Sequence, residues 1–138
     1  DGGVIKRAVG LLYMGHRPGL NELLSPFENL RWCAGLQERD VSPETLLSAI
    51  HYVGLDRYKD EPCRTLSAGQ MRRAALARLC ISKSRLWLLD EPMTSLDDDA
   101  VALVRDLIAK HRSAGGGCIC ATHVTLEFPQ TRVLELGA

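Results

Sequence analysis

A continuous apolar run that ends in two carboxylates is the feature that most constrains the fold of this sequence. Residues 86–89 read Leu-Trp-Leu-Leu, and Asp90, Glu91 and Pro92 follow directly. Such a run is typical of a central parallel strand that is covered on both faces, and ligands bind at the carboxyl ends of these strands. The sequence therefore predicts an α/β fold with a ligand-binding edge at Asp90 and Glu91.

The two adjacent carboxylates limit what can bind at this edge. Two negative charges side by side need a cation or a proton to be stable together, and Mg²⁺ with a nucleotide phosphate supplies a cation. Strand alternation turns Asp90 and Glu91 to different sides, so that one can hold a metal while the other faces an attacking water. The alternative interpretation is a solvated turn before Pro92.

A helix start precedes the apolar run. Ser67 is a good N-cap, Gly69 lets a ligand approach the backbone, and Gln70 to Ile81 has helical periodicity. The free N–H groups and the dipole of such a helix start favour a phosphate. The alternative is a helix cap that holds no ligand.

The remaining segments alternate between strand and helix patterns. A buried strand is expected over Val9–Met14, and a capping box at residues 25–28 starts a helix from Pro26 to about Leu36. Further helices and strands are expected at Pro43 to Gly54, at residues 98–111, at Cys118–Ala121 and at Thr131–Leu136. This order predicts a layered, mainly parallel sheet with a helical insert.

Composition narrows the function classes. The 138 residues predict one domain, and 17 basic against 17 acidic residues favour no nucleic-acid partner. No apolar run approaches the length of a membrane span. The odd set of five cysteines predicts small core thiols in a reducing compartment rather than a zinc site or a disulfide framework.

Four ordered motifs resemble those of the ABC ATPase family. Leu66-Ser67-Ala68-Gly69-Gln70 is similar to its signature loop, residues 88–92 to its Walker B strand, residues 95–97 to its D-loop, and residues 121–123 to its switch-histidine segment. The resemblance implies a P-loop NTPase-like fold that binds ATP and Mg²⁺.

The family motifs also imply a role for each matching residue. Asp90 would hold Mg²⁺ through water, Glu91 would be the general base, and His123 would sense the γ-phosphate. The signature loop would be offered to the ATP of a second subunit in an ABC-type homodimer. Asp97 would bridge the two ATP sites of that dimer.

A more specific likeness comes with one departure from the family pattern. Residues 12–19 and 28–31 are similar to the ATP-binding subunits that serve haem export in cytochrome c maturation. The glutamine of the family's Q-loop is replaced here by Arg17, which cannot accept a metal bond. Arg17 either meets the γ-phosphate, marks an altered site, or is an exposed loop arginine.

The 138 residues contain no Gly-x-x-x-x-Gly-Lys-Ser/Thr loop, the Walker A motif that cradles phosphates. In the family this loop precedes the segment matched here, so the N-terminal part is expected to be missing. The chain would then be a partial ABC ATPase domain over residues 1–138: a fragment, a processed chain, or one half of a split protein whose other chain carries Walker A. Alone, it is expected to be nearly inactive.

The predicted function is that of the ATP-binding subunit of an ABC transporter, most like a haem exporter for cytochrome c biogenesis. Residues of about 20–66 would form a helical subdomain that docks onto transmembrane permease subunits, and the remainder a RecA-like core. The expected location is cytoplasmic, on the inner face of the bacterial inner membrane or its organelle equivalent. The alternatives are a non-catalytic ABC-like interaction module and an ABC-type ATPase of DNA repair, although the heptads and basic surface expected of the latter do not occur.

Overall fold

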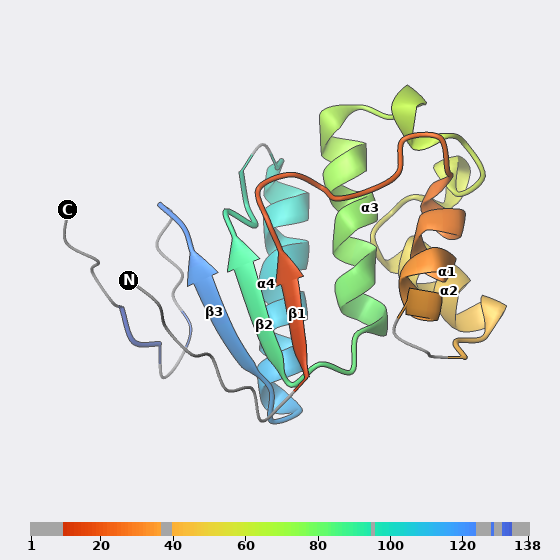
Figure 1. Ribbon diagram of the computed structural model, residues 1–138. Coiled ribbons are helices and arrows are strands. Elements are labelled where there is room, and N and C mark those ends of the chain that lie inside the picture. The colour runs from red at the N-terminus through yellow and green to blue at the C-terminus, as the bar shows by residue number, and fades with distance from the viewer. Residues whose placement is uncertain (1–9, 37–39, 95, 124–127, 129–130, 134–138) are drawn as a thin grey trace, which may run out of the picture.

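The computed structural model describes residues 10–36, 40–94, 96–123, 128 and 131–133. Within them, three strands form a parallel sheet in the order β1-β2-β3: β1 is Leu11–Met14, β2 is Leu86–Asp90 and β3 is Gly117–Ala121. In the register of the sheet Leu11 lies opposite Leu86, and Asp90 lies opposite Ala121. The predicted α/β fold with a parallel sheet is confirmed, and the carboxyl ends of all three strands lie at one edge (Figure 1).

One face of the sheet packs against two long helices, α3 (Ala68–Ile81) and α4 (Asp98–Ser113) (Figure 1). Trp87 and Leu89 of β2 are buried there, while Leu86 and Leu88, which alternate with them, are half-buried. On the opposite face Tyr13 is 61% exposed and Ile119 is 59% exposed. The prediction that β2 is covered on both faces therefore holds for one face only among the described residues.

Helix α3 starts from a capping box. The Ser67 hydroxyl accepts a hydrogen bond from the Gln70 N–H, and the Gln70 side chain accepts one from the Ser67 N–H. The helix begins at Ala68, directly after Ser67, the residue that the sequence predicts as its N-cap. The apolar stripe buries Ala75, Leu76 and Leu79, as the periodicity predicts.

The segment before α3 is helical and lies beside it (Figure 1). It comprises α1 (Pro26–Leu36), α2 (Pro43–Tyr52) and the two 3₁₀ turns η1 (Asp56–Tyr58) and η2 (Cys63–Thr65). The expected capping box of Ser25 and Glu28 is present at α1, and Ser42 caps α2. Gly54, where α2 was predicted to end, has a φ of 73°, which glycine adopts without steric cost.

Tyr52 ties this helical segment to the core. Its hydroxyl donates a hydrogen bond to the Asp106 carboxylate and accepts one of 3.0 Å from the Lys110 ammonium, both on α4. Of the two aromatic residues on α1, Phe27 is half-buried and Trp32 is 54% exposed. Trp32 therefore remains available for a partner, whereas Tyr52 has its partners within the chain.

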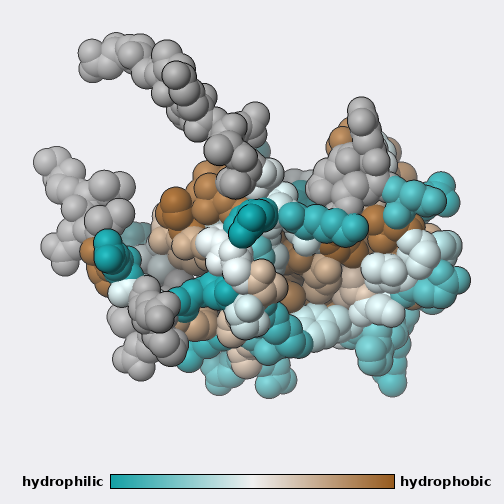
Figure 2. All heavy atoms as spheres, turned by 90° about the horizontal axis from the view of Figure 1, so that it is seen from below, coloured by the Kyte–Doolittle hydropathy of each residue, from teal (hydrophilic) through white to brown (hydrophobic). Residues whose placement is uncertain are grey.

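Two of the elements predicted from the sequence differ from those in the structure. Helix α4 extends to Ser113, past the predicted end at His111. Residues 131–133 form no strand, and the rest of the strand predicted over Thr131–Leu136 lies outside the described residues. Seen from below, apolar side chains lie in groups that alternate with polar ones, and polar side chains gather along the lower border of the view (Figure 2). In the described part of the chain, no helix is long and apolar enough to cross a membrane.

Candidate functional site

The site begins where β2 ends. Glu91, the first residue after the strand, has a φ of 48°, in the left-handed region that residues other than glycine rarely adopt. Its N–H donates a 2.8 Å hydrogen bond to the carbonyl of Ala121, the last residue of β3. A non-glycine residue keeps such a conformation only where its surroundings impose it, and strain of this kind clusters at functional sites.

The Glu91 carboxylate contacts two side chains. Thr94 Oγ1 donates a hydrogen bond of 3.2 Å to Glu91 Oε2, and His123 Nε2 lies 3.3 Å from Glu91 Oε1. The His123 side chain is 97% exposed, whereas that of Glu91 is 21% exposed. Because β2 and β3 are neighbours, the structure brings His123 to the strand end that carries Asp90 and Glu91.

Arg72 of α3 is the residue of this site that the sequence analysis missed. Its Nη1 donates to the carbonyls of Gly15 and His16, at 3.1 and 3.0 Å, and its Nη2 donates to those of Asp90 and Glu91, at 3.4 and 2.7 Å. Burial lowers the pKa of the Arg72 guanidinium, and the negative charge of Asp90 opposes that shift. A single cation thus joins the carboxyl ends of β1 and β2.

The signature-like loop lies on the same side of the molecule, because α3 begins at the side where the strands end (Figure 1). Its residues Ser67 and Ala68 are exposed, while Leu66, Gly69 and Gln70 are half-buried. The side chains of Ser67 and Gln70 hydrogen-bond each other's backbone in the capping box. A Cβ atom on Gly69 would meet nothing within 4 Å, so the space beside its backbone is open to a ligand.

Asp97 and Arg17 occupy different surroundings. Asp97 Oδ1 accepts hydrogen bonds from the Ala100 N–H at 2.8 Å and from Arg73 Nη2 at 2.9 Å. Asp97 therefore caps α4 and links it to α3. Arg17 is exposed in the loop after β1, next to the His16 carbonyl that Arg72 holds.

The carboxylate of Asp97 offers a pH test of this arrangement. The Ala100 N–H makes the largest single contribution to lowering the pKa of Asp97 from its ordinary value, and Arg73 lowers it further through its charge and its hydrogen bond. We expect Arg73→Gln to move this pKa back upward only in part, because the Ala100 N–H remains. A lowered pKa stabilises the fold above the unfolded pKa of aspartate, about 3.9. That stability is lost as the pH falls through the folded pKa. Carboxyl NMR titration of Asp97 in the wild type and in Arg73→Gln measures the shift. A full return of the pKa to its ordinary value would contradict the contribution of the Ala100 N–H.

A metal at this edge would depend on a substrate for part of its coordination. Among the described residues, no group of three or more histidine, cysteine, aspartate or glutamate side chains could hold a metal ion. Mg²⁺ fits this donor set, because it is usually bound by one or two carboxylates together with waters and substrate phosphates. Asp90, which is half-buried at the end of β2, carries a carboxylate of the kind that such coordination uses.

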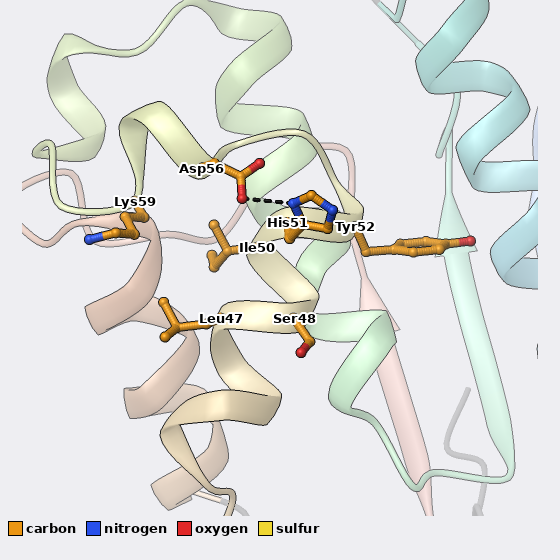
Figure 3. A pocket seen from close by; sticks show the side chains of 7 residues that line it. All are labelled: Leu47, Ser48, Ile50, His51, Tyr52, Asp56 and Lys59. Atoms are coloured by element: carbon orange, nitrogen blue, oxygen red, sulfur yellow. Dashed lines mark hydrogen bonds and ion pairs between the residues drawn. The ribbon is translucent and has the colours of Figure 1, made fainter.

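A surface hollow of about 470 Å³ lies elsewhere, on α2 and η1. Leu47 and Ile50 line it together with His51, whose Nδ1 lies 2.8 Å from Asp56 Oδ1 (Figure 3). None of its lining residues belongs to the strand-end edge. In the part of the chain that the structure describes, the candidate site is therefore the strand-end edge and not this hollow.

Solved structures share this fold. One titled as the dimeric post-hydrolysis state of the ATP-binding cassette MJ0796 bound to ADP and Pi superimposes with a TM-score of 0.73 at 22% identity, over 83% of this chain and 53% of that chain. A second, an ATP-binding subunit of an ABC transporter, also gives 0.73 at 22% identity, over 83% of this chain and 49% of that one. At these identities the likeness establishes the fold alone.

The sequence itself matches named proteins and a family model. It is 48% identical over 130 residues to the cytochrome c biogenesis ATP-binding export protein CcmA of Hahella chejuensis, covering 93% of this chain and 61% of that protein. The identity to CcmA of Cupriavidus necator is 47% over 128 residues, covering 93% and 56%. The chain thus spans about three-fifths of these relatives. Residues 5–94 match the ABC transporter family model, and the chain therefore belongs to the ABC transporter family.

Proposed function

We propose that this chain carries the hydrolytic edge of an ATPase that drives an ABC transporter. The observation that supports this most directly is the grouping of Asp90, Glu91 and His123 at the carboxyl ends of two adjacent strands, with His123 Nε2 3.3 Å from the Glu91 carboxylate. Phosphoryl transfer to water needs a positioned base, a cation ligand and a donor to the γ-phosphate. These three side chains can provide those functions.

Each side chain has one task in this proposal. Glu91 accepts the proton of the attacking water, and Thr94 holds the other carboxylate oxygen, which keeps the base in one orientation. His123, exposed beside Glu91, donates a hydrogen bond to the γ-phosphate. Asp90 holds Mg²⁺ through a water, and that ion, when bound with ATP, neutralises phosphate charge.

The signature-like loop serves a second subunit. The N–H groups at the start of α3, together with the open space beside Gly69, suit a phosphate that arrives from outside this chain. We therefore propose an ABC-type homodimer in which residues 66–70 face the partner's ATP and Asp97 lies between the two sites. A protein with this fold is named as a dimer bound to ADP and Pi, and the proposed dimer follows that precedent.

The phosphates also need a cradle that this sequence does not contain. We propose that a segment with a Walker A loop completes the site, either in the same polypeptide or as a separate chain. We call this chain together with that segment the assembled ATPase. Residues of about 20–66 form the helical subdomain that docks onto transmembrane permease subunits, with the exposed Trp32 available for that contact.

The relatives suggest the pathway in which this ATPase works. CcmA proteins are named as cytochrome c biogenesis ATP-binding export proteins, and two of them are 47% and 48% identical to this chain. We propose that this chain has the same role, with haem handling as its purpose. It would then act from the cytoplasmic face of the membrane that holds its permease, the inner membrane in a bacterium.

Calorimetric titration with Mg-ATP tests the proposal. We expect no measurable binding to this chain alone and binding to the assembled ATPase, because the Walker A lysine and N–H groups supply most of the charge complement to the phosphates. Hydrolysis by the isolated chain would contradict the proposed division of the site. Absence of binding in both samples would favour a non-catalytic module, the alternative that Arg17 at the Q-loop position suggests.

A further inference from the structure

Arg72 is buried to an extent that is unusual for arginine. Only 5% of its surface is exposed, and its guanidinium donates to backbone carbonyls rather than to a carboxylate. Arginine is almost never buried unless it is paired, so the four carbonyl contacts have to compensate for the lost hydration of the charge. The side chain is therefore held firmly in one place.

Its four acceptors belong to two separate strand ends. The carbonyls of Gly15 and His16 follow β1, and those of Asp90 and Glu91 end and follow β2. The planar guanidinium directs its donors along fixed directions, so it sets the spacing between these two ends. A flexible ammonium group on the same stem would not impose that geometry.

Glu91 accepts the shortest of the four hydrogen bonds that Arg72 donates. Glu91 has a left-handed φ of 48°, and both of its backbone polar groups are hydrogen-bonded. Its N–H donates to the Ala121 carbonyl at 2.8 Å, and its carbonyl accepts from Arg72 Nη2 at 2.7 Å. The direction of a side chain follows from the backbone that carries it. The contact with Arg72 therefore determines where the Glu91 carboxylate points relative to Thr94 and His123.

We propose that Arg72 is the positioning residue of the general base: by clamping the β1 and β2 ends, it holds the Glu91 backbone in the strained conformation that aims its carboxylate at the attacking water. This inference rests on the proposed function, since it needs Glu91 to be the base. Because Arg72 lies on α3, the helix whose start we assign to the partner's ATP, it also joins that helix rigidly to the base.

A double-mutant cycle in the assembled ATPase tests the role. We expect Arg72→Met to lower kcat by about 100-fold with the KM for ATP changed less than about twofold, because misplacing a reacting group costs rate rather than binding. In a Glu91→Gln background the same substitution should lower the residual single-turnover rate by less than about twofold, since no base remains to be positioned. Arg105→Met, at an exposed position of α4, is the matched control and should keep wild-type kcat.

The other outcomes distinguish a failure of the positioning role of Arg72 from a failure of Glu91 as the general base. Equal losses from Arg72→Met in the wild-type and Glu91→Gln backgrounds would overturn the positioning role and leave a purely structural arginine. Wild-type hydrolysis by Glu91→Gln alone would instead overturn the proposed base, whatever Arg72 does. If circular dichroism shows that Arg72→Met does not fold, Arg72→Lys decides: it keeps the charge but not the two-sided clamp, and we expect a kcat loss of about 10-fold that disappears in the Glu91→Gln background.

Discussion

Glu91→Gln should lower the kcat of the assembled ATPase by a factor of about 100 to 10,000, the range that a general base contributes. Glutamine keeps the size of the side chain and can still accept the Thr94 hydrogen bond of 3.2 Å. It cannot accept a proton from water at neutral pH. The dissociation constant for Mg-ATP should change little, because the Asp90 carboxylate and the signature-like loop remain in place. Single-turnover hydrolysis and calorimetry measure the two quantities.

A matched glutamate shows whether the effect belongs to the site. Glu61 is exposed in the helical segment, and Glu61→Gln removes the same charge without touching the strand ends. This control should hydrolyse ATP at the wild-type rate. The base assignment fails if Glu91→Gln and Glu61→Gln behave alike, or if Glu91→Gln loses ATP binding together with hydrolysis.

Much of the fold was predictable because its signals are local. The start of α1 at Pro26, the start of α2 at Pro43 and the cap at Ser67 each depend on residues within four positions of the helix start. The apolar run over β2 is equally local, and the carboxyl ends of parallel strands necessarily meet at one edge. The approach of His123 to Glu91 follows from that geometry once β2 and β3 are neighbours.

The parts that were missed depend on contacts between distant segments. Arg72 reads in the sequence as one of several polar positions on a helix, and its acceptors are backbone carbonyls up to 57 positions away. Every residue has a backbone carbonyl, so the sequence does not indicate which carbonyls an arginine will contact. The left-handed φ of Glu91 is hidden for a similar reason: glutamate is a poor candidate for that conformation, and only the fold imposes it.

Asn29 is a second case of this kind, in the helical segment. It is 2% exposed, and its amide nitrogen donates to the carbonyls of Asn21, Leu24 and Ser25 at 3.0, 3.2 and 3.0 Å. Its amide oxygen accepts a 2.8 Å hydrogen bond from the Asn21 N–H. The side chain therefore replaces backbone pairing for the loop that precedes α1.

This loop supports the entry to the signature-like loop. The N–H of Cys63 donates to the Leu24 carbonyl and that of Arg64 donates to the Glu22 carbonyl, both at 2.9 Å. Residues 63 and 64 belong to η2, which directly precedes Leu66. Asn29 thus stabilises, through one intermediate segment, the backbone that leads into the start of α3.

Asn29→Ala should lower the free energy of unfolding by about 3 kcal/mol, because buried backbone groups lose their partners and each unsatisfied group costs about 1–3 kcal/mol. Urea unfolding followed by circular dichroism measures the change. Asn21→Ala is the matched control: its exposed side chain accepts a hydrogen bond of 3.0 Å from the Leu23 N–H, so we expect a loss below about 1 kcal/mol. Equal losses from the two substitutions would contradict this role of Asn29. They would mean that the backbone hydrogen bonds of Cys63 and Arg64 hold the loop and that the Asn29 side chain adds no stability.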